Sequence, residues 1–263
     1  MQQVTTLEAM LRRDRGIVLV GLAVITLLAW AYMVYLARDM NTGMSMSTNM
    51  ATPVTQSWGA VDFTLTFAMW AVMMTAMMAP TATPMVLVYA SLNRKRSDPQ
   101  PPFMSTAIFL LGYLVIWSGF AALATLAQWG LHMGALLSPM MVSTSPILGG
   151  TLLLAAGVFQ LSPMKYACLA SCRTPIGFLM TEWRDGPRGA LAMGLLHGRY
   201  CLGCCWVLMS LLFVLGVMNL LWIAALAAFV LVEKVVPRGH LISQATGLLL
   251  AVWGVWMVAA ELV

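Results

Sequence analysis

Long uninterrupted apolar stretches constrain this chain more than any other feature of its sequence. Several of them reach the roughly 20 residues that an α-helix needs to cross the hydrocarbon core of a bilayer. Overall, 61% of the 263 residues are hydrophobic and only 9% are charged. Because a helix satisfies its own backbone hydrogen bonds inside a bilayer, this pattern predicts an all-α, polytopic transmembrane bundle.

We expect one integral membrane domain over residues 1–263. Its expected spans, about seven in number, cover residues 17–36, 64–90, 105–128, 146–164, 189–216, 219–236 and 241–261. The first stretch is too long for the apolar core of a secretory signal peptide, roughly 7–15 residues. Pro80 and Pro84 predict a kink or a break in the second span.

Basic residues alternate from one side of these spans to the other. Those expected on the inner side are Arg12, Arg13, Arg15, Arg94, Lys95, Arg96, Lys165, Arg173, Arg184, Arg188, Lys234 and Arg238. The loops on the other side carry only Arg38. Basic loops favour the cytoplasm, so we expect the N-terminus inside and the C-terminus outside. The basic excess is then a signal of topology in a lipid bilayer and does not indicate a nucleic-acid partner.

The segment from His197 to Cys205 reads HGRYCLGCC and lies inside the fifth apolar stretch. Ionisable groups at membrane depth are costly and usually face a protein interior. With 3.6 residues per turn, His197, Cys201 and Cys204 or Cys205 fall on one helical face. One nitrogen and several sulfurs on one stripe are a donor set for a soft metal ion. The alternative is ordinary packing, since cysteine also behaves as a small hydrophobic residue.

Two further cysteines, Cys168 and Cys172, lie in the expected inner loop between the fourth and fifth spans. If this segment is helical, their spacing puts both thiols on one face. Cys201 is expected roughly 20 Å deep in its span. The two groups of thiols then form one site only if the loop folds inward. Otherwise they form two separate binding sites. Arg199 is offset from the cysteine stripe, and Glu233 is its nearest candidate partner in sequence.

Methionine supplies a third set of soft donors. Met69, Met73 and Met77 form one stripe at helical spacing in the second span, and Met74 and Met78 form another. Thioethers bind Cu(I) and hardly bind hard cations. A methionine stripe is also common as core packing, so both explanations stay open. The polar outer loop adds Met40, Met44, Met46 and Met50, where burial does not explain them.

The combination of motifs resembles a bacterial family of predicted metal-binding integral membrane proteins. The matching motifs are Met73–Pro80 (MMTAMMAP), Phe159–Lys165 (FQLSPMK), Gly194–Trp206 (GLLHGRYCLGCCW), Val217–Leu220 and Glu233-Lys234, within about residues 64–240. The resemblance implies a multi-pass protein of the bacterial inner membrane. Its metal-binding label implies as ligand positions Cys168, Cys172, His197, Cys201, Cys204 and Cys205.

These observations favour binding of a soft metal, with Cu(I) expected ahead of zinc, for metal handling or transport. A metallochaperone or a membrane complex would then be a partner. One alternative is a membrane thiol oxidoreductase that uses Cys201 and Cys204, whose spacing is CxxC, with Cys168 or Cys172 as resolving thiols. Another is a non-catalytic accessory subunit of a membrane complex. Ordinary enzyme chemistry has no motif to support it.

Overall fold

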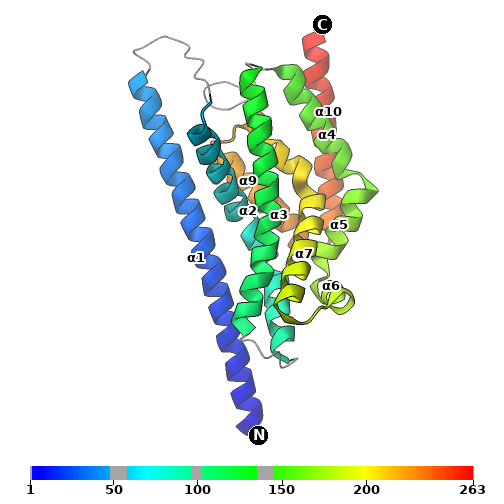
Figure 1. The fold of residues 1–263 in the computed structure, drawn as a ribbon. Helices are drawn as coiled ribbons and strands as arrows, with labels where there is room; N and C mark the ends of the chain where they lie inside the picture. Colours follow the sequence, from blue (N-terminus) through cyan, green and yellow to red (C-terminus); the bar gives the residue numbers. More distant parts are fainter. Residues whose placement is uncertain (1, 48–57, 96–101, 135–144, 263) are drawn as a thin grey trace.

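Helix is the only regular structure in the part of the chain that the computed structural model describes, residues 2–47, 58–95, 102–134 and 145–262. The all-α prediction is therefore confirmed for these residues (Figure 1). The helices are α1 (Gln2–Ser47), α2 (Ala60–Lys95), α3 (Pro102–Met133), α4 (Pro146–Gln160), α5 (Pro163–Arg173), α6 (Pro175–Glu182), α7 (Gly186–Ser210), α8 (Leu212–Leu215), α9 (Leu220–Val235) and α10 (Gly239–Leu262).

Five helical segments are long and apolar enough to cross a membrane. They are Arg15–Asp39, Ala60–Arg94, Phe103–Met133, Gly186–Leu215 and Gly239–Glu261. The bent pair α4 and α5 would raise the number to six if it counts as one span. The sixth expected span, residues 219–236, matches α9, which has 16 residues and is about 24 Å long at 1.5 Å per residue.

The fourth expected span, residues 146–164, divides into two helices. α4 ends at Gln160, and the chain then bends by 63° into α5. The hydroxyl oxygen of Ser162 accepts a hydrogen bond from the backbone N–H of Lys165 (3.2 Å), and Pro163 stands at the first helical position. Ser-Pro is a strong helix start, so a second helix begins inside the expected span and continues into the expected loop. Residues 165–188, expected as a loop, thus contain the rest of α5 and all of α6.

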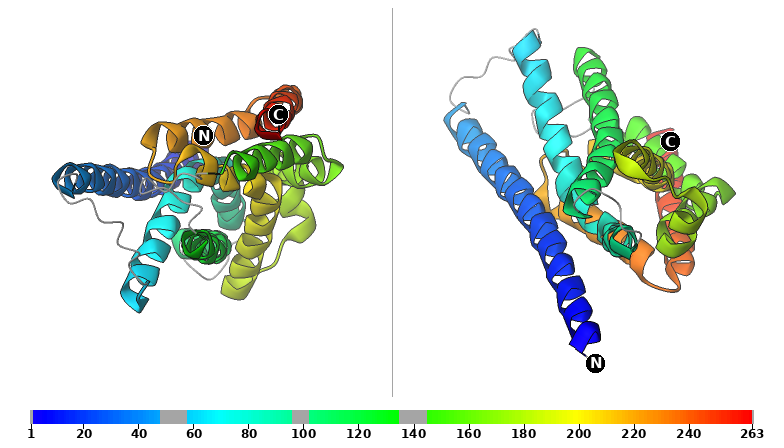
Figure 2. Two further views of the ribbon diagram at one scale, coloured as in Figure 1. Left: turned by 90° about the horizontal axis from the view of Figure 1, so that it is seen from above. Right: turned by 60° about the horizontal axis from the view of Figure 1, so that its bottom comes forward.

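Helix α1 also extends beyond its expected end and runs to Ser47, so residues 40–47 of the expected outer loop are helical. It packs along α2 at one edge of the bundle (Figure 1). At the opposite edge α4 packs along α10 (Figure 2). Large apolar side chains on both edge helices face outward, among them Leu27, Leu28, Leu249 and Trp256. Such outer faces are compatible with a lipid environment.

The centre of the bundle is made by α2, α3 and α7. Helices α3 and α7 come very close at Gly194, where an added Cβ would collide with the backbone carbonyl oxygen of Phe109. Small residues at helix contacts allow this approach in membrane proteins. The close contact fixes the height of α7, which carries the histidine and three of the cysteines, relative to α3.

The sequence predicted a kink or a break in the second span, and helix α2 passes through Pro80 and Pro84 without a break. A proline removes one backbone donor and exposes a carbonyl in the preceding turn. Near this point the carbonyl oxygen of Met78 accepts hydrogen bonds from the hydroxyls of Tyr113 (3.0 Å) and Thr81 (2.9 Å). These hydroxyls bind in the turn between Ala76 and Pro80, the two residues whose carbonyls lose their usual helical donors to the prolines.

Candidate metal centre

The four predicted donors of α7 all point into the protein. His197, Cys201, Cys204 and Cys205 are each at most 2% exposed. Their common face is the one that the helical spacing predicted. Arg199 lies on the exposed side of the same helix, beside Phe120 and Trp206 in a cavity between α3 and α7. The sequence had suggested Glu233 as its partner, but Glu233 pairs with a different cation.

The sulfur of Cys201 is surrounded by polar groups from three other helices. Lys234 of α9 donates a hydrogen bond from its ammonium to this sulfur, with an Nζ–Sγ distance of 3.0 Å. The hydroxyl oxygen of Tyr113, in α3, lies 3.1 Å from the same sulfur. Lys234 also donates to the hydroxyl of Thr81, in α2, at 3.0 Å. Cys201 is therefore the point at which α2, α3, α7 and α9 meet.

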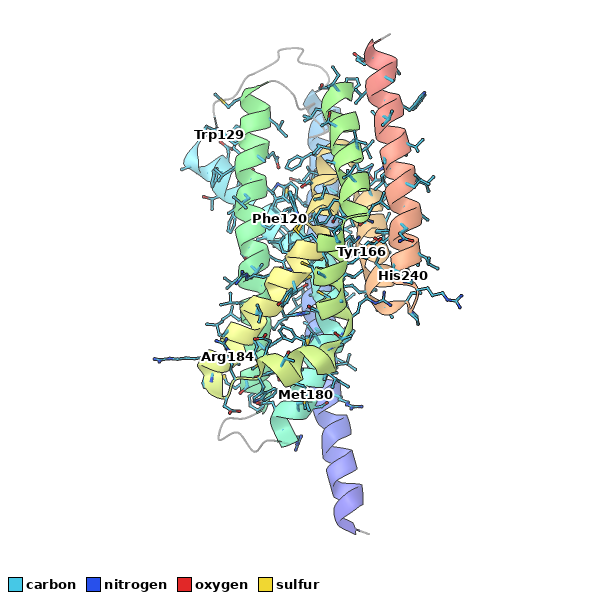
Figure 3. All side chains as sticks on the ribbon, turned by 90° about the vertical axis from the view of Figure 1, so that its right-hand side faces the viewer. Phe120, Trp129, Tyr166, Met180, Arg184 and His240 are labelled. Atoms are coloured by element: carbon cyan, nitrogen blue, oxygen red, sulfur yellow. The ribbon has the colours of Figure 1, made fainter. Side chains whose placement is uncertain are left out.

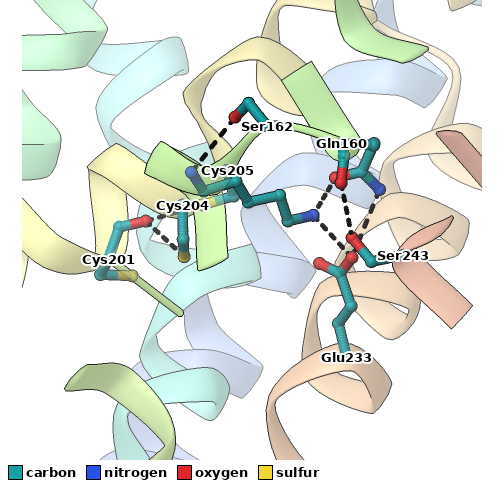
Figure 4. A network of polar contacts seen from close by, with 8 residues as sticks. Gln160, Ser162, Cys201, Cys204, Cys205, Glu233 and Ser243 are labelled. Atoms are coloured by element: carbon teal, nitrogen blue, oxygen red, sulfur yellow. Dashed lines mark hydrogen bonds and ion pairs between the residues drawn. The ribbon is translucent and has the colours of Figure 1, made fainter. Parts of the chain in front are cut away.

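The other two thiols of α7 lie one turn further along the helix. Cys204 and Cys205 both donate to the backbone carbonyl oxygen of Cys201, at 3.0 Å each (Figure 4). Helical cysteines commonly satisfy their thiol this way when no better acceptor is near. Both sulfurs remain within reach of the Cys201 side chain by rotation about the Cα–Cβ bond.

Helix α5 brings the remaining two cysteines to the same place. Cys172 lies close enough to Cys201 and Cys204 for its thiol to interact with both. Cys168 lies against α7 at Gly203, where an added Cβ would stand 2.8 Å from its sulfur. The sequence left open whether the two cysteine groups meet, and the bend before α5 brings them together. We call Cys168, Cys172, Cys201, Cys204 and Cys205 the thiol cluster.

His197 sits one turn before Cys201 in an aromatic cage. Its ring centroid lies 6.1 Å from that of Phe109, 5.5 Å from Tyr113 and 5.7 Å from Phe178. Its Nδ1 atom is buried and has no hydrogen-bond partner among the described residues. Leaving a buried nitrogen without a partner costs free energy. This nitrogen is therefore a candidate metal ligand that no described protein group occupies.

The thiol cluster is not arranged as a finished coordination sphere. Nowhere in the described ranges do three or more His, Cys, Asp or Glu side chains form a group that could hold a metal ion. The thiols of Cys204 and Cys205 bind the backbone carbonyl of Cys201 in their own helix. Chemically, the clustered donors are thiols with an imidazole nearby, a soft set suited to Cu(I) or zinc.

The methionines of α2 are part of the core. Met69, Met73 and Met77 are buried, as are Met74 and Met78. By helical spacing Met74, Met77 and Met78 lie on the same side of α2 as Thr81, which contacts Lys234. The outer methionines Met40, Met44, Met46 and Met50 fall outside the residues whose side chains the structure describes.

Beside the thiol cluster lies a second buried polar group, which the sequence reasoning missed. The ammonium of Lys165, in α5, lies 2.6 Å from a carboxylate oxygen of Glu233, in α9. Gln160 donates to the same oxygen at 3.3 Å and accepts a hydrogen bond from Lys165 (Figure 4). The signal available in the sequence was the charged pair Glu233-Lys234 at the end of an apolar stretch.

Two of the basic residues that were assigned to inner loops are therefore interior residues. Lys165 is fully buried and Lys234 is 8% exposed, and each has a specific polar partner. Arg184, by contrast, projects away from the bundle, as expected of a loop residue (Figure 3). The physical reason is that each ammonium has polar partners in the core: the carboxylate of Glu233 for Lys165, and the sulfur of Cys201 with the hydroxyl of Thr81 for Lys234.

Comparison with known proteins identifies one related group. A family model described as PpoB2, copper chaperone, matches residues 67–257, which include every residue of the thiol cluster and its polar neighbours. No curated protein and no solved structure matches the chain.

Proposed function

The chain belongs to the PpoB2 copper chaperone family, and on that premise we propose that it binds Cu(I) at the thiol cluster within a membrane and passes it on. Copper is here the cargo of the protein. The observation that carries the proposal is the meeting of Cys172 from α5 with Cys201 and Cys204 from α7. Thiolates are preferred ligands of Cu(I), and His197 offers an unused nitrogen one turn away.

Binding requires only local changes in this arrangement. Cys204 and Cys205 would turn from the carbonyl of Cys201 toward the arriving ion, which side-chain rotation allows. Cys172 would approach from the opposite wall. Because α5 is a short helix of 11 residues that follows a sharp bend, a small movement of α5 would open or close the cluster. A donor that can be withdrawn suits a protein that must release its cargo.

The buried methionines of α2 suggest a route to this point. Met74, Met77 and Met78 lie on the Thr81 side of the helix, and Met69 and Met73 continue the stripe toward the other end. Thioethers hold Cu(I) less tightly than thiolates, so affinity would rise from the methionines to the thiol cluster. In this proposal copper arrives through the outer methionines and leaves to a metallochaperone or a membrane-complex partner.

We further propose the topology of a multi-pass protein of the bacterial inner membrane, with seven crossings, the N-terminus in the cytoplasm and the C-terminus outside. The start of α1 and the end of α10 lie at opposite ends of the bundle, which supports an odd number of crossings (Figure 1). The exposed basic residues Arg184 and Arg188 support an inner location for the segment before α7. Reporter fusions after residues 15, 134 and 262 test this topology.

Cu(I) binding by the purified full-length protein tests the function. We expect competition with a colorimetric Cu(I) chelator to show binding by the unaltered protein. Cys172→Ser and Cys201→Ser should each lower the affinity at least about tenfold, as expected for loss of a metal-binding group. Ser210→Ala, a change at the half-buried last residue of α7, is the matched control and should leave the affinity unchanged. Equal binding by all four proteins would contradict the proposal.

One observation also favours a second function, thiol–disulfide exchange. The same contact of Cys172 with Cys201 and Cys204 gives an attacking thiol two possible partners, and the ammonium of Lys234 lies 3.0 Å from the sulfur of Cys201. A redox protein would form a disulfide under mild oxidant and transfer it to a substrate. Thiols that stay reduced under those conditions, together with Cu(I) binding, would exclude it.

A further inference from the structure

We propose that Lys234 makes the thiol cluster select a monovalent over a divalent soft cation. The inference rests on the proposed function, because it assumes that the cluster binds a metal ion. It goes beyond that function by naming the residue that discriminates Cu(I) from Zn(II), two ions for which the thiols and the imidazole are both suitable ligands.

Lys234 is held against the cluster and does not reach for solvent. Its ammonium donates to the sulfur of Cys201 and to the hydroxyl of Thr81, both at 3.0 Å. These two bonds occupy two of the three donors of the group. The side chain comes from α9, whereas the thiols come from α5 and α7. The positive charge thus comes from a helix that carries none of the thiols of the cluster.

A carboxylate does not neutralise this charge. Glu233, the next residue in the chain, pairs with Lys165, whose ammonium lies 2.6 Å from its carboxylate oxygen. Among the described residues, Lys234 forms no ion pair with an aspartate or a glutamate at contact distance. Its contacts are the sulfur of Cys201 and the hydroxyl of Thr81, so any metal ion that binds at the thiol cluster lies beside this positive charge.

The effect of that charge differs between the two metals. For the same set of ligands, an ammonium repels a divalent cation twice as strongly as a monovalent one. In a buried site this repulsion is several times stronger than it would be in water, because the effective dielectric constant is lower. Lys234 consequently lowers the affinity for Zn(II) more than it lowers the affinity for Cu(I), whichever of the thiols provide the ligands.

The decisive measurement is the ratio of the Cu(I) and Zn(II) dissociation constants, obtained by chelator competition on the full-length protein. Lys234→Gln removes the charge, keeps an amide that can donate to Thr81 and adds no sulfur that could bind Cu(I). We expect it to shift the ratio toward Zn(II) by about tenfold or more. Lys234→Arg keeps the charge and should keep the ratio. Arg199→Gln removes an exposed cation from α7, away from the cluster, and is the matched control.

A general loss of structure would weaken binding of both metals, so it would not move the ratio in one direction. If Lys234→Gln does not fold, Lys234→Leu provides the same test, since it also removes the charge without adding a metal ligand. A ratio that stays within about twofold of the unaltered protein in the neutral variant overturns this inference and leaves copper binding intact. If the unaltered protein binds neither ion, the proposed function itself fails.

Discussion

Lys165 and Glu233 form an ion pair of 2.6 Å in which the two side chains are 0% and 2% exposed. It joins α5, which carries Cys168 and Cys172, to α9, which carries Lys234. Two consecutive residues of α9 therefore contact two different helices of the site, α5 and α7. Glu233 binds Lys165 of α5, the helix that carries Cys168 and Cys172, and Lys234 contacts Cys201 on α7.

Breaking this pair on one side should be strongly destabilising. Glu233→Gln leaves the ammonium of Lys165 buried without a counter-charge, which typically costs about 3–5 kcal/mol. We expect a clear fall in the unfolding temperature of the detergent-solubilised protein. The double variant Lys165→Met, Glu233→Met removes both charges and should recover most of the loss. Glu261→Gln, at an exposed carboxylate, is the control and should have little effect.

The thiols should differ in reactivity according to their burial. Cys168 and Cys172 are partly exposed, whereas Cys201, Cys204 and Cys205 are buried. A maleimide reagent followed by mass spectrometry should therefore modify the two cysteines of α5 first. Bound Cu(I) should slow the modification of Cys172. The same rate for all five thiols in the folded protein would contradict the arrangement of the thiol cluster.

Much of the helical arrangement follows from apolar length alone. The predicted spans 64–90, 105–128 and 241–261 each lie within one helical segment of the structure. The span predicted at 189–216 passes the end of its segment, Gly186–Leu215, by one residue, and α9 differs from its prediction, 219–236, by one residue at each end. The error at 146–164 has a local cause. The Ser162-Pro163 pair starts a new helix, and an average of hydrophobicity over a window does not register such a start.

Only the part of the site that lies within α7 could be predicted from the sequence. The common face of His197, Cys201 and Cys205 follows from helical periodicity. The partners of Cys201 could not be found in this way, because Tyr113 lies 88 residues away and Lys234 lies 33 residues away in the chain. A buried charge forms an ion pair with the opposite charge that the fold places near it. Glu233 therefore pairs with Lys165 and not with Arg199. The tertiary contacts, and not the spacing, decide such pairs.

The hydroxyl of Tyr113 should contribute to stability where that of Tyr166 does not. Tyr113 donates to the carbonyl of Met78 and contacts Cys201, whereas the buried hydroxyl of Tyr166 has no hydrogen-bond partner in the described part of the chain. Tyr113→Phe keeps the ring against His197 and should lower the free energy of unfolding by about 1 kcal/mol. Tyr166→Phe should be neutral or stabilising. Thermal unfolding compares the two variants, and a reversed order would show that the proline-disturbed turn of α2 does not need this donor.

The contact between α3 and α7 provides the most direct test of the fold around the site. A methyl group at Gly194 would collide with the backbone carbonyl oxygen of Phe109, and backbone cannot move aside as a side chain can. Gly194→Ala should therefore force α7 away from α3 and cost at least the 1–3 kcal/mol or so that is typical of overpacking.

The control for this change is another glycine in the same helix pair. An added Cβ at Gly119, in α3, meets no atom of the described structure within 4 Å. Gly119→Ala should thus be neutral, or stabilising by about 0.5–1 kcal/mol, because alanine favours a helix over glycine. Unfolding temperature and Cu(I) affinity should both fall in Gly194→Ala alone, since displacement of α7 moves Cys201 away from Tyr113 and Lys234. Equal behaviour of the two variants would mean that the close packing of these helices does not position the thiol cluster.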